Sequence, residues 1–184
     1  MNKADSKTVI LKVSFFSLLF LLLHVTYAQN EKIYELFENE TLQNRTTTNQ
    51  SKTSLSNKNT YNSNLNEFYQ LHNNVHPTVY VAGNSVKNRA GKLKPLKLTA
   101  EDVVALTSLN QSNALYSSVQ LLTIKLENPS DLNRVLDLSK LQGFTNLEFV
   151  FIQSPFKISV NQVRNFILNP GPNVTIYFMN VNPS

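Results

Sequence analysis

The 184-residue chain contains no cysteine and only four glycines. Without cysteine the protein forms no disulfide and has neither a thiol nucleophile nor a thiolate metal ligand, so its fold must rest on core burial. The glycines are too scattered for a Gly-rich phosphate loop or a Gly-x-Ser-x-Gly nucleophile elbow. Beyond residue 28, no apolar run reaches the ~18–20 residues that a membrane-spanning helix needs. These absences exclude thiol chemistry and argue against P-loop nucleotide binding.

One apolar run is present, at the N-terminus, and its surroundings are those of a secretory signal peptide. Lysines precede the apolar residues 13–23, and the small residues Thr26 and Ala28 stand at the third-last and last positions before a cleavage site. We predict that residues 1–28 are removed, so that the chain meets a membrane only through this segment before cleavage. The product is expected to be secreted or periplasmic.

The charge that remains after this cleavage is small. Residues 29–184 carry 14 basic and 11 acidic side chains, a net charge of +3. A surplus of this size is weak grounds for a nucleic-acid partner, which an exported protein rarely meets. The Ala-Gln-Asn junction and the Asn- and Lys-rich composition resemble those of exported proteins of Gram-negative bacteria. Nothing in the sequence fixes the oligomeric state.

Residues 29–75 form a polar leader that is rich in Asn, Thr, Ser, Lys and Gln. Such a segment buries too little apolar surface to offset the entropy of ordering, so we predict that it is mostly disordered. Two short groups have helical spacing and are interpreted as transient helices that dock on the domain or on a partner. These groups are Ile33, Leu36 and Phe37, and Leu65, Phe68, Tyr69 and Leu71.

Residues 76–184 are rich in aliphatic and aromatic side chains and contain a repeat. Residues 121–129 align with residues 147–155 at a displacement of 26, and a third copy, residues 174–179, follows after 27. Apolar residues fall at positions 1, 4 and 6 of each copy, which indicates a strand within a longer repeat.

Helical patterns fill the gaps between these strands, and Ser159 and Gln162 form a capping box. Strands that alternate with short helices predict an α/β fold with a small parallel sheet built from βα repeats, in one domain. The predicted helices are 99–109, 130–138 and 160–168; the predicted strands are 119–126, 147–153 and 174–180, with a further strand near 78–81.

The stretch Leu138–Ile152, LSKLQGFTNLEFVFI, resembles a leucine-rich repeat, because apolar residues recur at three-residue steps before the strand pattern. The resemblance covers about residues 121–179. Pro129 and Pro155 stand where that family usually places Asn in the turn after the strand, so a compact domain fits better than a long horseshoe. The resemblance implies that a partner lies across the open face of the sheet.

Alternation along the strands predicts which residues share a face. One face, the expected core, carries Leu122, Ile124, Leu126, Val150, Ile152, Tyr177 and Met179. The other carries Thr123, Lys125, Phe149, Phe151, Ile176 and Phe178. Either residues 99–109 or an N-terminal strand covers this second face, as is usual in parallel sheets, or the face is open and binds a partner. In the open case the partner-binding residues are Lys125, Phe149, Phe151, Ile176 and Phe178.

Residues 86–97 contain five cations and no acid, which would suit an anionic glycan, a lipid headgroup or an acidic partner. These candidate anion-binding residues are Lys87, Arg89, Lys92, Lys94 and Lys97. The alternatives are a solvated connecting loop, or an edge strand over residues 92–98 whose lysines guard against sheet association.

Signals for catalysis are weak. His72 and His76 have helical spacing but no third ligand, and Pro77 disfavours helix at His76, so we expect no metal and no cofactor. Nothing meets the requirement for a nucleophile, a base and an orienting group, so we expect no enzyme. The sequence therefore favours a secreted non-catalytic interaction module that binds a protein or an envelope component. The alternatives are a small exported hydrolase using paired carboxylates among Asp131, Asp137 and Glu148, and a structural envelope protein.

Overall fold

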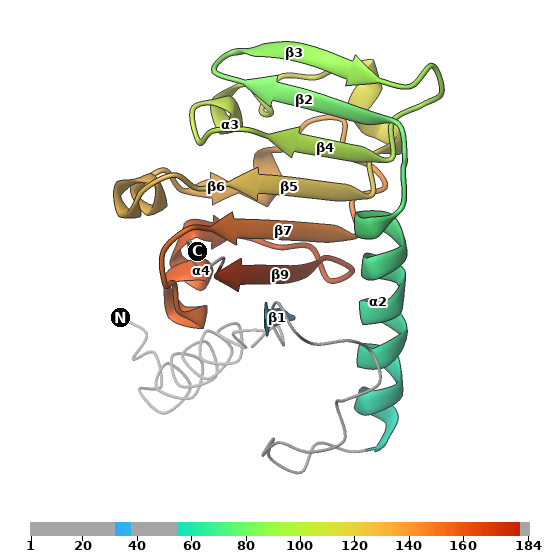
Figure 1. Cartoon of the computed structure of the whole chain (residues 1–184), viewed down its shortest axis with the longest axis vertical. Coiled ribbons are helices and arrows are strands. Elements are labelled where there is room, and N and C mark those ends of the chain that lie inside the picture. Colours follow the sequence, from blue (N-terminus) through green and yellow to red (C-terminus); the bar gives the residue numbers. More distant parts are fainter. Residues whose placement is uncertain (1–31, 38–54, 181–184) are drawn as a thin grey trace, which may run out of the picture. The chain divides into compact units, whose positions relative to one another are not determined.

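A computed structural model describes residues 32–37 and 55–180 of the chain, and the predicted signal peptide lies outside them. These residues belong to a compact unit that spans Glu31–Ser184. The fold is α/β, with a seven-stranded sheet in the order β1-β9-β7-β5-β4-β2-β3 (Figure 1). All neighbouring strands are parallel except β2 and β3, which form an antiparallel hairpin.

The strands of this sheet are β1 (Ile33–Leu36), β2 (Thr78–Ala82), β3 (Ser85–Ala90), β4 (Lys97–Ala100), β5 (Leu121–Lys125), β7 (Phe149–Ser154) and β9 (Thr175–Asn180). A second, two-stranded parallel sheet pairs β6 (Leu136–Asp137) with β8 (Ile167–Leu168). The α-helices are α2 (Leu55–Asn73), α3 (Ala105–Ser108) and α4 (Val160–Phe166). The 3-10 helices are η1 (Ala114–Ser118), η2 (Pro129–Asn133) and η3 (Leu138–Lys140).

The predicted parallel order of the repeat strands is confirmed, as is the strand near residues 78–81. The capping box that begins α4 is also confirmed: the Ser159 hydroxyl accepts from the backbone N–H of Gln162, whose side chain accepts from the backbone N–H of Ser159.

The predicted helix 99–109 is confirmed only for residues 105–108, and the predicted helix 130–138 is wrong. Residues 97–100 are an interior strand that pairs with β2 and β5, and α3 begins only where Asp102 accepts a hydrogen bond from the Ala105 N–H. Residues 130–138 form a 3-10 turn followed by strand β6. The Asp131 carboxylate bonds back to the N–H groups of residues 127 and 128, which closes a tight turn rather than starting a long helix.

One face of the sheet, which we call the connection face, is covered by the segments that link its strands. Side chains from α3, η1, α4 and the β6–β8 pair pack there against a largely aliphatic surface. Its central row runs across five strands and consists of Val79, Leu98, Leu122, Val150 and Ile176.

The other face, which we call the aromatic face, is covered by α2. This helix runs across the parallel strands near their amino ends (Figure 1). It buries Leu65, Phe68 and Leu71 against Leu36, Leu121, Phe149, Phe151 and Tyr177. The prediction of a mostly disordered leader is therefore wrong for α2. It is also wrong for residues 33–36, which form an edge strand beside β9 and not a helix.

Strand β9 has the opposite face assignment from the predicted one. The sequence alignment placed Tyr177 opposite Val150, a displacement of 27, whereas the strands pair Val150 with Ile176, a displacement of 26. Because successive side chains of a strand point to opposite faces, this one-residue difference exchanges the faces. Ile176 and Phe178 lie in the connection-face core, and Tyr177 lies under α2.

Candidate functional site

The centre of the aromatic face is a group of rings around Phe68 of α2. Its ring centroid lies 4.6 Å from that of Tyr177 and 5.2 Å from that of Phe151. Phe149 makes a third, edge-on contact at 6.1 Å. Tilted and edge-on pairs at these separations are favourable beyond the area that they bury. Phe68 is fully buried, so this one side chain is the main anchor of α2 on the sheet.

The structure does not bring the five expected partner-binding residues together on an open surface. Phe149 and Phe151 are buried under α2, whereas Ile176 and Phe178 are buried in the connection-face core. Lys125 is exposed at the carboxyl end of β5. The interpretation in which the chain covers its own aromatic rings is the correct one, but the cover is α2 and not residues 99–109.

His72 lies in the last turn of α2, and its ring stacks on Phe68 and meets Phe151 edge-on. Burial lowers the pKa of His72, and the positive charge of Lys97 lowers it further. The Lys97 ammonium donates to the carbonyl oxygens of His72 and Asn74, at 3.2 and 3.1 Å, and so caps the C-terminus of α2. The helix ends at Asn73, so His76 does not share a helix face with His72.

Residues 91–95, which we call the basic turn, lie between β3 and β4 and are held by three features. The Arg89 guanidinium donates to the carbonyl oxygens of Lys92 and Leu93, at 3.3 and 2.6 Å. Ser118 Oγ donates to the carbonyl oxygen of Pro95 at 2.7 Å. Gly91 has φ +89°, and an added Cβ there would lie 3.1 Å from Cβ of Pro77. The turn therefore has a fixed shape.

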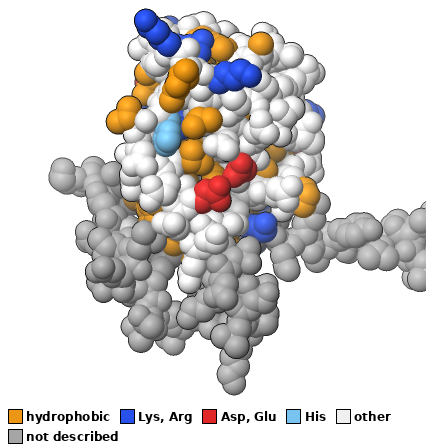
Figure 2. Space-filling view, turned by 90° about the vertical axis from the view of Figure 1, so that its right-hand side faces the viewer, with side chains coloured by type: hydrophobic (Ala, Val, Ile, Leu, Met, Phe, Trp, Pro, Cys, Tyr) orange, Lys and Arg blue, Asp and Glu red, His pale blue; other side chains and the backbone are white. Residues whose placement is uncertain are grey.

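The five candidate anion-binding residues divide into two groups. Arg89 and Lys97 are engaged with backbone carbonyls, so they position the chain. The side chains of Lys87, Lys92 and Lys94 are exposed and make no hydrogen bond or ion pair with any described residue. In the space-filling view, Lys and Arg side chains gather at the upper end of the face, with hydrophobic side chains beside them (Figure 2).

Two of the exposed apolar side chains near this end are Leu93 and Val75. Leu93 is 75% exposed between Lys92 and Lys94, and Val75, just after α2, is completely exposed at 102%. Sequence reasoning missed both residues. The exposure of Leu93 could have been predicted from its position in a short charged turn, because a turn has no strand or helix periodicity that would place its side chain in the core.

The three candidate carboxylates lie in separate places. Glu148 precedes β7 and Asp131 follows β5, so they stand at opposite ends of the parallel strands, about 15 Å apart along the strand direction. Burial and the Glu67 carboxylate raise the pKa of Glu148, and a hydrogen bond from Gln120 lowers it in part. Asp131 closes η2 through backbone bonds.

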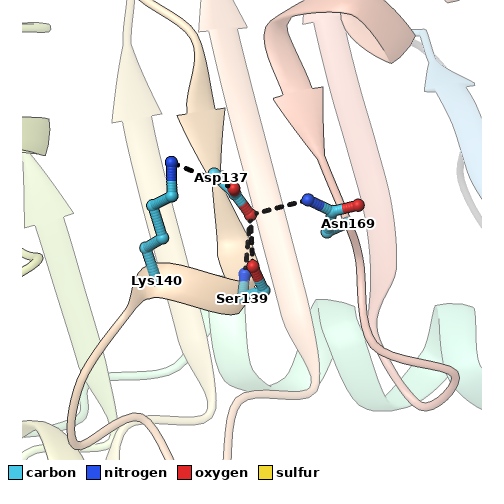
Figure 3. A network of polar contacts seen from close by, with 4 residues as sticks. All are labelled: Asp137, Ser139, Lys140 and Asn169. Carbon is cyan, nitrogen blue, oxygen red and sulfur yellow. Dashed lines mark hydrogen bonds and ion pairs between the residues drawn. The ribbon is translucent and has the colours of Figure 1, made fainter.

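Asp137 is held at the β6–β8 pair by several donors (Figure 3). Its carboxylate accepts from the hydroxyl of Ser139 at 2.7 Å and from Nδ2 of Asn169 at 3.0 Å, and Lys140 lies at 3.4 Å. These bonds lower its pKa to about 2. Through its bond to Asn169, Asp137 links the connection between β5 and β7, which contains β6, to the connection between β7 and β9, which contains β8. Asn169 directly follows β8 and has φ +50°.

Within residues 32–37 and 55–180, no three His, Asp or Glu side chains are grouped so that they could hold a metal ion. Among the same residues, no helix has the length and apolar character needed to cross a bilayer. No family model, no curated protein and no solved structure matches this chain. The basic turn is therefore the candidate site on geometry alone.

Proposed function

We propose that this protein is an exported, non-catalytic interaction module that binds an anionic component of the cell envelope, or an acidic protein, through the basic turn. The observation that carries this proposal is that the side chains of Lys92 and Lys94 in the turn, and of Lys87 on the preceding strand β3, have no anionic partner among the described residues. Unpaired cations on a shaped turn attract anions without first breaking internal ion pairs.

A binding role, rather than a catalytic one, is supported by what the candidate carboxylates do. Asp131 and Asp137 accept hydrogen bonds that shape the connections, and Glu148 stands at the other end of the strands from Asp131. The hydrogen bonds of Asp131 and Asp137 thus have a structural explanation that involves no substrate.

Export is supported by the N-terminal pattern of lysines, an apolar run and small residues. The resemblance to leucine-rich repeats supports recognition as the broader role. In that family a partner lies across the open sheet face; here α2 occupies that face, so we place binding at the basic turn instead.

The proposal is tested by salt elution of the exported protein from an immobilised sulfated polysaccharide. The Lys92→Gln/Lys94→Gln variant is expected to elute at lower salt than the unmodified protein, because two of the contacting charges are gone. The matched control is Lys125→Gln/Lys157→Gln, which removes two exposed lysines, one at the carboxyl end of β5 and one beyond the carboxyl end of β7. If the two variants elute at equally lowered salt concentrations, only the net charge of the protein matters, and the proposal is overturned.

A further inference from the structure

We infer that the surface that binds the basic turn is an anionic lipid bilayer, and that Leu93 and Val75 enter its headgroup region while Lys92 and Lys94 contact the phosphates. This inference rests on the proposed function and names the partner of the same site. It is carried by the combination of unpaired charge, exposed aliphatic side chains and a backbone held in a fixed shape.

The aliphatic side chains distinguish a bilayer from a soluble polyanion. A glycan or an acidic peptide satisfies lysines but leaves Leu93 in water, 75% exposed as it is in the free protein. A bilayer offers both chemistries at once, because anionic headgroups lie directly above an apolar layer that accepts a leucine or valine side chain.

The segment that carries Val75 is fixed to the basic turn. The carbonyl oxygen of Pro77 accepts from the backbone N–H groups of Leu96 and Lys97, at 3.0 and 3.3 Å. Pro77 also packs against Gly91, the first residue of the turn. The two exposed aliphatic side chains therefore project from neighbouring loops at the amino end of the sheet.

The basic turn and the neighbouring strands β2, β3 and β4 contain no acidic residue, whereas Glu67 and Glu148 lie at the same end of the sheet but further along it, near β5 and β7. Residues 83–100 contain no Asp or Glu. The next acids along the chain, Glu101 and Asp102, follow β4 at its opposite end, where Asp102 bonds to the N–H groups of Gly83 and Ala105. On the face in view, the acidic side chains lie apart from the upper group of Lys and Arg (Figure 2). An anionic surface that approaches the basic turn itself therefore meets cations first.

The test is co-sedimentation of the exported protein with vesicles. Intact mass first establishes which N-terminus the protein carries. Vesicles made of phosphatidylcholine and phosphatidylglycerol in equal amounts are compared with vesicles of phosphatidylcholine alone, at low salt. The unmodified protein is expected to bind the first and not the second.

The variants separate charge from insertion. Lys92→Gln/Lys94→Gln is expected to weaken vesicle binding about twenty-five-fold, since one lysine near an anionic leaflet contributes about fivefold. Leu93→Ser is expected to weaken it about tenfold through lost apolar contact. The matched controls, Lys125→Gln/Lys157→Gln and Leu168→Ser, change exposed residues elsewhere and should bind nearly as the unmodified protein does. Thermal melting checks that each variant is folded.

Three results would overturn the inference. If Leu93→Ser binds vesicles as tightly as the unmodified protein, the turn recognises charge alone. If phosphatidylglycerol vesicles are not bound but poly-glutamate is, with loss in the Lys92/Lys94 variant, the partner is an acidic polypeptide and the proposed function stands. If neither probe is bound through the turn, the proposed function fails together with the inference.

Discussion

The two faces of the sheet are closed in different ways. The connection face is covered by segments that link neighbouring strands, so its cover lies close by as soon as the strands pair. The aromatic face is covered by α2, a helix that precedes six of the seven strands in the sequence. It is closed only if that helix docks. A face with large rings can thus obtain its cover from a polar segment that supplies a few well-placed side chains.

The largest effect is expected from removing the anchor of that cover. Phe68→Ala deletes a fully buried ring that contacts Phe151 and Tyr177, and it should lower the free energy of unfolding by about 3–5 kcal/mol. Urea unfolding followed by circular dichroism measures this. Asn66→Ala, an exposed change two residues away, should alter stability by less than about 0.5 kcal/mol. Equal stability of the two variants would contradict the docked helix.

A matched change on the connection face sharpens the comparison. Phe166→Ala removes an equally buried ring from α4 and should also cost about 3–5 kcal/mol. Hydrogen exchange should distinguish the two variants. Faster exchange in Phe68→Ala is expected mainly in α2, whereas in Phe166→Ala it should extend into β7 and β9, which α4 connects. Identical exchange patterns would remove the distinction between the two faces.

A smaller loss is expected from the C-terminal cap of α2. Lys97→Met keeps the aliphatic stem but removes the bonds to the carbonyl oxygens of His72 and Asn74. It should lower the free energy of unfolding by about 1–2 kcal/mol, as measured by urea unfolding. Lys125→Met is the control, because Lys125 is exposed on β5 and caps no helix. No difference between the two variants would show that Lys97 does not hold the helix end.

Acid should weaken the two faces in separate pH windows. The pKa of His72 is lowered by burial, so the unfolded chain takes up this proton more readily than the folded one. The contribution of His72 to the free energy of unfolding is therefore complete above about pH 6.5 and falls as the pH drops through the lowered pKa.

The pKa of Asp137 is lowered to about 2, so its contribution to the free energy of unfolding is lost between about pH 4 and pH 2. Unfolding measured against pH should show both windows, with the upper one absent in His72→Phe and the lower one absent in Asp137→Asn.

The smallest expected effect is a gain. The ionised form of Glu148 is disfavoured by burial and by the Glu67 carboxylate. Glu148→Gln removes that repulsion and keeps an oxygen for Gln120, so it should raise the free energy of unfolding by up to about 0.5 kcal/mol. Thermal melting at neutral pH measures this, and a lower melting temperature would contradict the assignment.

The sequence was sufficient for the strands β5, β7 and β9 and for the start of α4, because their patterns are local. It was insufficient for the faces of β9, since an error of one residue in aligning repeats reverses every side chain. It was also insufficient for α2, whose buried residues Leu65, Phe68 and Leu71 are separated by polar ones. Their burial depends on rings that lie about 80 to 110 residues further along the chain.

The candidate site could be predicted in part. A run of five cations indicated it, but only the folded chain shows that Arg89 and Lys97 are engaged by carbonyl oxygens while Lys92 and Lys94 are not. Hydrogen bonds between residues far apart in sequence decide this, and a linear pattern does not contain them. The same holds for Val75, which comes next to the basic turn through the contact of Pro77 with Gly91.

The most direct test of the closed aromatic face is amide hydrogen exchange of the protein, read by mass spectrometry over peptides from α2 and from β7. If α2 is docked through Phe68, peptides from residues 61–73 should be protected nearly as strongly as those from Phe149–Ser154. Exchange of residues 61–73 at the rate of an unstructured peptide, with β7 still protected, would contradict it.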